Sequence, residues 1–218
     1  MAYKSLQAFG ESVFLEKKSR FIGSALPVEK EEEALAFLER IRKEQPQATH
    51  HCYCYLIGAS AQVTRFSDDG EPSGTAGLPM LEVCLQKELT NLCCVVSRYF
   101  GGIKLGAAGL VRAYRRSVRE SLDQARLVRY IPWQKVQFSL AYEHLGKLDY
   151  QRMGRAVEEV ERVFTDCVTL VWWLPEEEVI RWHQELSALS AGQLTWQEGP
   201  CCFRPEPAQW ERTDERAE

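Results

Sequence analysis

The chain has 218 residues, of which 45% are hydrophobic and 27% charged, a composition that suits a folded protein with a sizeable core. No run approaches the roughly 18 apolar residues of a membrane span, and the N-terminal segment lacks the apolar stretch of a signal peptide, so we expect a cytoplasmic protein without membrane contact. Residues 1–129 carry 18 Lys and Arg against 15 Asp and Glu, whereas residues 130–218 carry 9 against 16. This asymmetry permits an anionic partner for the first half only.

Hydrophobic periodicity predicts an alternation of strands and helices in the first half. We expect a hairpin over 13–28, strands over 51–57, 62–67 and 91–100, and helices over 29–43, 80–88 and 105–126. Pro79 suits the first turn of the second helix. On the last helix, four arginines at i, i+3, i+4 and i+7 share one face, with Glu120 as the single nearby acid.

The second half predicts a different arrangement. The segment 130–133 reads as a domain boundary, followed by strand 135–142, helix 144–153, strands 156–164 and 167–174, helix 176–190 and strand 193–202. A βαββαβ order is that of a ferredoxin-like domain. We therefore predict domains over 1–130 and 131–204, with a charged, proline-containing and disordered tail over 205–218.

The eight cysteines include two adjacent pairs and no CxxC spacing. In a reducing compartment they are best interpreted as small buried hydrophobes. Neighbouring His50 and His51 lead into a strand and point to opposite faces, so they do not easily reach one metal. A nucleophilic Cys–His pair with Cys52 or Cys54 is a weaker alternative.

A first glycine-bearing loop, DDGEPSGTAG, spans residues 68–77. Its candidate residues combine three carboxylates, small hydroxyls and glycines: Asp68, Asp69, Gly70, Glu71, Ser73, Gly74 and Thr75. The carboxylates could hold Mg²⁺ or act as a base. Pairing with Arg98 or Arg112, and capping of the next helix by Ser73 or Thr75, are structural alternatives that we favour.

A second loop connects the predicted strand that contains Arg98 to the arginine-rich helix. Glycines and cations before a helix start form a natural anion cradle. The spacing is neither that of a Walker A loop nor that of a dinucleotide-binding fingerprint. We expect the backbone at Gly101, Gly102 and Gly106 to approach phosphates, with side-chain contacts from Arg98, Lys104, Arg112, Arg115, Arg116 and Arg119. Tyr99 and Phe100 could stack on bases, although core packing is the favoured interpretation for both.

Taken together, these segments resemble the YigZ/IMPACT family. The resemblance is carried by KKSRFIG (17–23), ATHHCYCY (48–55), FSDDGEPSGTAGLPML (66–81) and VSRYFGGIKLGAAGLVRAY (96–114). Two positions depart from the family pattern: Ala108 replaces a usual glycine, and His51 stands where asparagine is common.

The resemblance implies an α+β protein. Its N-terminal domain would have the ribosomal-protein-S5-domain-2-like fold, which also occurs in domain IV of elongation factor G, and its C-terminal domain would resemble domain V of that factor. It further implies non-catalytic binding of RNA or the ribosome and a role in translation, with no catalytic residue, metal or cofactor. An enzyme for a small phosphorylated substrate that uses the Asp68/Asp69/Glu71 loop, and a protein-interaction module, remain the alternatives.

Overall fold

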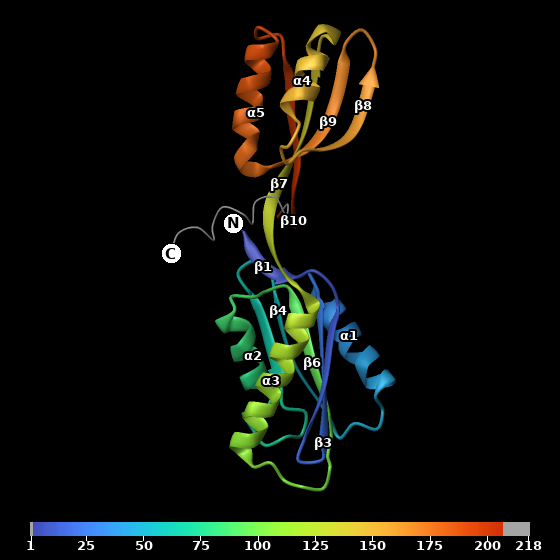
Figure 1. The fold of residues 1–218 in the computed structure, drawn as a ribbon, viewed down its shortest axis with the longest axis vertical. Helices are drawn as coiled ribbons and strands as arrows, with labels where there is room; N and C mark the ends of the chain where they lie inside the picture. Colours follow the sequence, from blue (N-terminus) through green and yellow to red (C-terminus); the bar gives the residue numbers. More distant parts are fainter. Residues whose placement is uncertain (1, 207–218) are drawn as a thin grey trace. The chain divides into compact units, whose positions relative to one another are not determined.

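The computed structural model describes residues 2–206, which divide into two compact units: Ala2–Arg129 and the residues from Tyr130 onward (Figure 1). The first unit contains β1 (Tyr3–Leu6), β2 (Gly10–Glu16), β3 (Ser19–Pro27), α1 (Glu31–Glu44), β4 (His50–Ile57), β5 (Val63–Ser67), α2 (Gly77–Gln86), β6 (Leu92–Tyr99) and α3 (Ala107–Ala125). The predicted hairpin and every predicted strand and helix of this half are present. None of the helices in 2–206 is both long and apolar enough to cross a bilayer.

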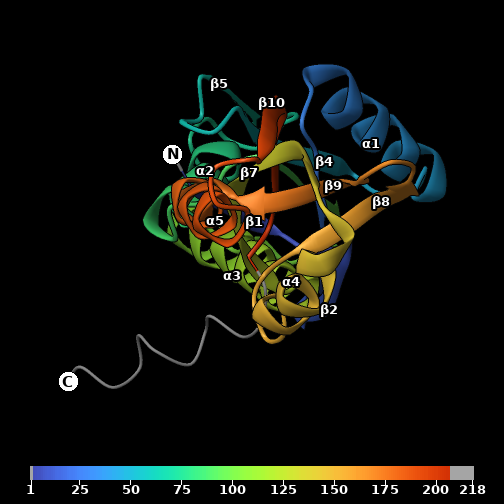
Figure 2. The ribbon, with the colours of Figure 1, turned by 90° about the horizontal axis from the view of Figure 1, so that it is seen from above.

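The first unit is built on an antiparallel sheet of order β2-β3-β6-β4-β5. Figure 2 shows α1 and α3 on opposite sides of these strands. One core lies between the sheet, α2 and α3, and a second lies between the sheet and α1. The central strand β6 is buried on both faces, which explains why its sequence is a continuous apolar run.

The second unit contains β7 (Leu127–Leu140), a 3-10 turn (Tyr142–His144), α4 (Leu145–Gln151), β8 (Glu158–Phe164), β9 (Val168–Pro175), α5 (Glu176–Leu189) and β10 (Thr195–Pro205). In its antiparallel sheet, β7 pairs with β10 and β9, and β9 pairs with β8. This is the predicted ferredoxin-like βαββαβ arrangement. Its core is rich in aromatic residues, with Trp172 packed edge-on against Phe138 and Trp182.

The division between the units falls at Tyr130, within the predicted boundary segment 130–133. The chain passes from one unit to the other along the continuous strand β7. Pro132 pairs with Phe203 of β10 and lies one residue before the β9 ladder, which begins at Trp133. The last strand runs to Pro205, the first residue of the predicted tail, and residues 207–218 of that tail lie outside the described part.

Candidate functional site

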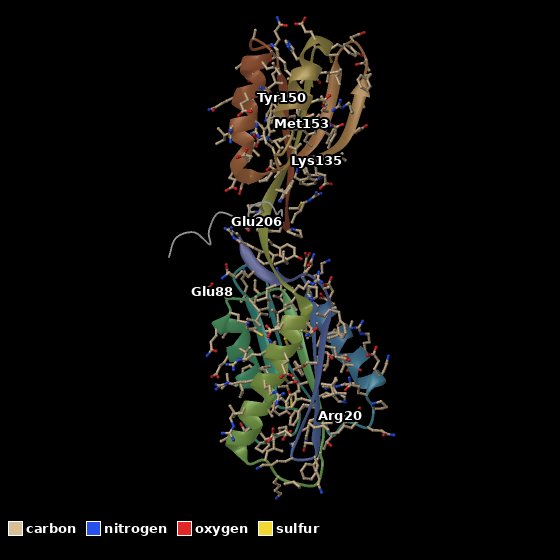
Figure 3. The ribbon with its side chains drawn as sticks, in the orientation of Figure 1. Arg20, Glu88, Lys135, Tyr150, Met153 and Glu206 are labelled. Carbon is tan, nitrogen blue, oxygen red and sulfur yellow. The ribbon has the colours of Figure 1, made fainter. Side chains whose placement is uncertain are left out.

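Three segments that are distant in sequence meet at one end of the first unit. They are the β2–β3 turn at Lys17 and Lys18, the 68–77 loop, and the 100–106 loop. Strand register brings them together, since Arg98 pairs with both Phe21 of β3 and His50 of β4. Figure 3 places Arg20, beside the turn, toward this end of the unit and Glu88 toward the other.

The two glycine-bearing loops are joined by a buried ion pair. Arg98 Nη1 donates to Glu71 Oε1 at 2.6 Å, and the two side chains are 6% and 3% exposed. The Tyr114 hydroxyl of α3 donates to the same oxygen at 2.7 Å, and burial raises the pKa of that phenol. Arg98 is therefore not the surface phosphate contact that we predicted, because its guanidinium neutralises a buried carboxylate. The sequence analysis favoured a structural pairing between a carboxylate of this loop and Arg98, and Glu71 makes that pairing.

The other two carboxylates of the 68–77 loop also have structural partners. Asp68 Oδ1 accepts hydrogen bonds from the N–H groups of Ala76 and Gly77, both at 2.9 Å, and Oδ2 accepts one from Gly74 at 2.8 Å. It thus satisfies the free N–H groups at the start of α2. The expected capping by Ser73 or Thr75 is wrong: Ser73 is exposed, and the Thr75 hydroxyl donates to the Pro72 carbonyl.

Asp69 secures the start of β4. Its Oδ2 accepts the backbone N–H of His51 at 2.6 Å, and its carbonyl lies 2.8 Å from Nδ1 of His50. His51 itself is buried, with Nδ1 2.9 Å from the Ser97 hydroxyl, and desolvation lowers its pKa. The carboxylates that could have supported catalysis thus hold the loop and the strand in place.

Close backbone approach explains one of the glycines. A Cβ on Gly101 would lie 2.0 Å from the Lys18 carbonyl oxygen, so this turn packs directly against the β2–β3 turn. Gly102 and Gly106 have φ of +82° and +76°, conformations that glycine adopts without strain. The loop therefore needs its glycines for conformation and packing, whether or not a ligand approaches.

A cavity of about 390 Å³, here called the helix-end pocket, opens at the start of α3. It is lined by Thr49, His50, Gly70, Glu71, Pro72, Arg98, Phe100, Lys104, Leu105, Gly106, Ala107 and Leu110. The first turn of α3 has no acidic residue and its N-cap, Gly106, has no side chain to satisfy the free N–H groups. Lys104 is exposed beside it. These features favour an anion in this pocket.

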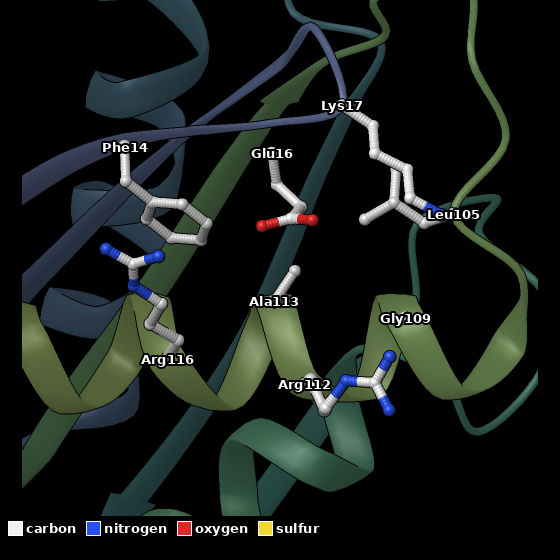
Figure 4. Close-up of a pocket in the computed structure, with 8 residues that line it drawn as sticks. All are labelled: Phe14, Glu16, Lys17, Leu105, Gly109, Arg112, Ala113 and Arg116. Carbon is white, nitrogen blue, oxygen red and sulfur yellow. The ribbon is translucent and has the colours of Figure 1, made fainter.

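A second cavity of about 230 Å³, here called the hairpin pocket, lies between β2 and α3 (Figure 4). Its walls are Phe14, Glu16, Lys17, Leu105, Gly109, Arg112, Ala113 and Arg116. Leu105 belongs to both pockets, so the two cavities adjoin. The structure thus adds Lys17 to the predicted cations.

The four helix arginines differ in their surroundings. Arg115 forms an ion pair with Glu82 of α2, an acid that the sequence did not place near it, and Arg116 pairs with Glu120 at 2.7 Å. Arg112 and Arg119 are exposed and have no hydrogen-bond or ion-pair partner within residues 2–206. Of the predicted phosphate contacts, Lys104, Arg112 and Arg119 are therefore the cations with the fewest internal partners.

Phe100 was expected to pack in the core, but its side chain is 46% exposed and lines the helix-end pocket. Tyr99 is half-buried, with the Arg20 guanidinium 4.2 Å from its ring centre. The exposure of Phe100 follows from its position as the first residue after β6, which ends at Tyr99.

The cysteines of the first unit are buried, and the grouping of three of them was not visible in the sequence. Cys54, Cys84 and Cys94 come from β4, α2 and β6, with sulfurs within 4.8 Å of one another, and all three are fully buried among apolar side chains. Buried cysteines in apolar surroundings pack as small hydrophobic side chains. We assign them to packing.

The fold and the site define a two-unit α+β protein whose first unit has a basic end built from three loops. Residues 17–122 match the Impact N-terminal domain family. Curated IMPACT family members include YvyE of Bacillus subtilis, 37% identical over 93% of both chains, and YigZ of Escherichia coli, 37% identical over 82% of this chain and 88% of that protein. A crystal structure of a hypothetical protein is 34% identical, covers 89% of this chain and 96% of its own, and has a TM-score of 0.60. The chain belongs to the IMPACT family.

Proposed function

We propose that this protein binds RNA through the basic end of its first unit, without catalysing a reaction on it, and that this binding regulates translation. The resemblance of the two domains to domains IV and V of elongation factor G supports an RNA or ribosomal surface as the target. The observation that carries the proposal is the uncapped start of α3, which opens into the helix-end pocket beside Lys104.

Comparison with the other two helices of the first unit makes this start distinctive. At α1 the first turn carries Glu31, Glu32 and Glu33, and at α2 the Asp68 carboxylate occupies the N-terminus. Both ends are therefore already supplied with negative charge. Only α3 presents free N–H groups to a cavity, where an external phosphate would be stabilised by the helix dipole.

The surrounding side chains suit a nucleic acid. Lys17, Lys104 and Arg112 add positive charge near the two adjoining pockets, and phosphate contacts of this kind give affinity without sequence information. The exposed ring of Phe100 offers a surface on which an unpaired base could stack. Because Asp68, Asp69 and Glu71 already bind protein groups, the proposal gives them no catalytic role.

The test is filter binding of a structured RNA over a salt series, comparing the wild type with Lys104→Gln/Arg112→Gln. Each lost phosphate contact should lower the slope of log affinity against log salt by about 1, so the double variant should lose about 2. A matched control is Lys30→Gln/Lys87→Gln, which removes the same charge from outside both pockets and should leave the slope within about 0.5 of the wild type.

Equal affinity and equal slope for the first variant and the wild type would overturn the proposal. So would a lysate partner that survives ribonuclease treatment while purified RNA fails to bind, because this outcome would assign the surface to an acidic protein.

A further inference from the structure

The hairpin pocket contains a feature that phosphate binding does not explain. Glu16 lies among three cations, yet it forms no hydrogen bond or ion pair in the described chain. Figure 4 shows its carboxylate pointing from β2 toward α3, between Arg116 on one side and Lys17 on the other. A carboxylate here repels phosphate, so its presence weakens a purely electrostatic RNA site.

None of the neighbouring cations forms a described ion pair with Glu16, so its carboxylate can accept hydrogen bonds from a ligand. Arg116 Nε donates to Glu120, and the Arg116 guanidinium lies 4.3 Å from the centre of the Phe14 ring. Lys17 and Arg112 have no described ion-pair partner, although both line the same cavity. The pocket therefore presents one acceptor-only group, two unpaired cations and a planar guanidinium held against an aromatic ring.

We infer that the hairpin pocket binds a single unpaired RNA base and that Glu16 selects guanine. An ionised carboxylate only accepts hydrogen bonds, through two oxygens side by side. Guanine presents two adjacent donors, its ring N1–H and its 2-amino group, on the edge that base pairing otherwise occupies. Cytosine and adenine offer one amino group beside an acceptor, and uracil offers one N–H between two carbonyls that would repel the carboxylate.

The other residues that line the hairpin pocket could contact the face of the base and the flanking phosphates. Unpaired bases stack on guanidinium planes as well as on aromatic rings, and the Arg116 plane over Phe14 provides such a surface. Lys17 and Arg112 would contact the flanking phosphates. Because Leu105 is shared with the helix-end pocket, the phosphate at the start of α3 and the base at Glu16 can belong to one strand. The inference rests on the proposed function and adds base selectivity to it.

The experiment is fluorescence anisotropy with oligouridine carrying one central test base, which avoids the self-association of guanine runs. The test bases are guanine, inosine, adenine, cytosine and uracil, and inosine lacks only the 2-amino group of guanine. We expect guanine to bind at least about fivefold tighter than uracil, with inosine in between.

The decisive variant is Glu16→Gln, with Glu11→Gln as the matched control on the same strand and outside both pockets. In Glu16→Gln the preference for guanine over uracil should fall below about twofold, while affinity for plain oligouridine stays equal or rises because a negative charge is gone. Glu11→Gln should keep the wild-type preference. Circular dichroism of both variants checks that the fold is intact.

Equal wild-type affinity for all five oligonucleotides would overturn guanine selection and leave the proposed function standing. A guanine preference that persists unchanged in Glu16→Gln would overturn the role of Glu16. Failure of every oligonucleotide and of structured RNA to bind at low salt would overturn the proposed function, and the inference with it.

Discussion

Glu71 of the 68–77 loop and Arg98 of β6 form a buried ion pair at 2.6 Å, and the Tyr114 hydroxyl donates to the same carboxylate oxygen. The pair joins the 68–77 loop to the end of β6, and both residues line the helix-end pocket. The shape of the pocket therefore depends on an ion pair that is almost completely buried.

Glu71→Gln should lower the stability of the first unit by about 3 kcal/mol, because Arg98 would keep a buried charge without its counter-ion. Hydrogen exchange of the first unit measures the loss. Tryptophan emission provides an internal control, since all six tryptophans lie at or beyond residue 133 and report on the second half. The comparison substitution is Glu120→Gln, which breaks the partly exposed pair with Arg116 and should cost at most about 1 kcal/mol. A similar cost for both would show that burial of the first pair has no energetic consequence.

Asp68→Ala should destabilise α2 by about 2 kcal/mol, because three backbone N–H groups lose their acceptor. Protection of the α2 amides in hydrogen exchange is the readout. Ser73→Ala, in the same loop, changes an exposed side chain with no described partner and should have no effect. If Asp68→Ala left α2 protection unchanged and instead abolished an activity, the carboxylate would have a chemical role and not a capping one.

The stability of the first unit should fall as the pH is lowered below about 6.5. His51 is buried and its folded-state pKa is lowered, so the unfolded chain takes up a proton before the folded one does. The stabilising contribution is therefore complete above the unfolded pKa and is lost as the pH falls toward the folded pKa. Unfolding by urea at pH 7.5 and 5.5, followed by circular dichroism, should show a smaller pH dependence in His51→Asn than in the wild type. An unchanged dependence would assign the effect to other groups.

Gly101→Ala should destabilise the contact between the 100–106 loop and the β2–β3 turn by about 2 to 3 kcal/mol, because the added carbon would overlap the Lys18 backbone. Gly102→Ala is the neighbouring control: its added carbon meets nothing within 4 Å, so only the positive φ costs energy, about 1 kcal/mol. Thermal unfolding compares the two. Equal losses would mean that the close backbone approach at Gly101 contributes nothing beyond conformation.

The sequence by itself determined the elements and their order. The apolar stripe of α3, the buried run of β6 and the βαββαβ pattern of the second half each follow from local periodicity, which depends only on which side of an element faces the core. The family resemblance came from contiguous motifs, which can be read without knowledge of the fold. These motifs include Asp68, Glu71 and Arg98.

Only the tertiary structure decided which charges meet. Arg98 and Glu71 pair across 27 positions, and Glu16 lines one pocket with Arg112, nearly a hundred positions further along the chain. These residues come together because β6 lies between β3 and β4 in the sheet and α3 packs against β2. The periodic pattern of an element predicts which of its side chains point away from the core. Whether such a side chain then meets solvent, an acidic residue or a cavity depends on strand order. That is why Arg98 is buried, Phe100 is exposed, and Lys17 and Glu16 line a pocket that the sequence did not predict.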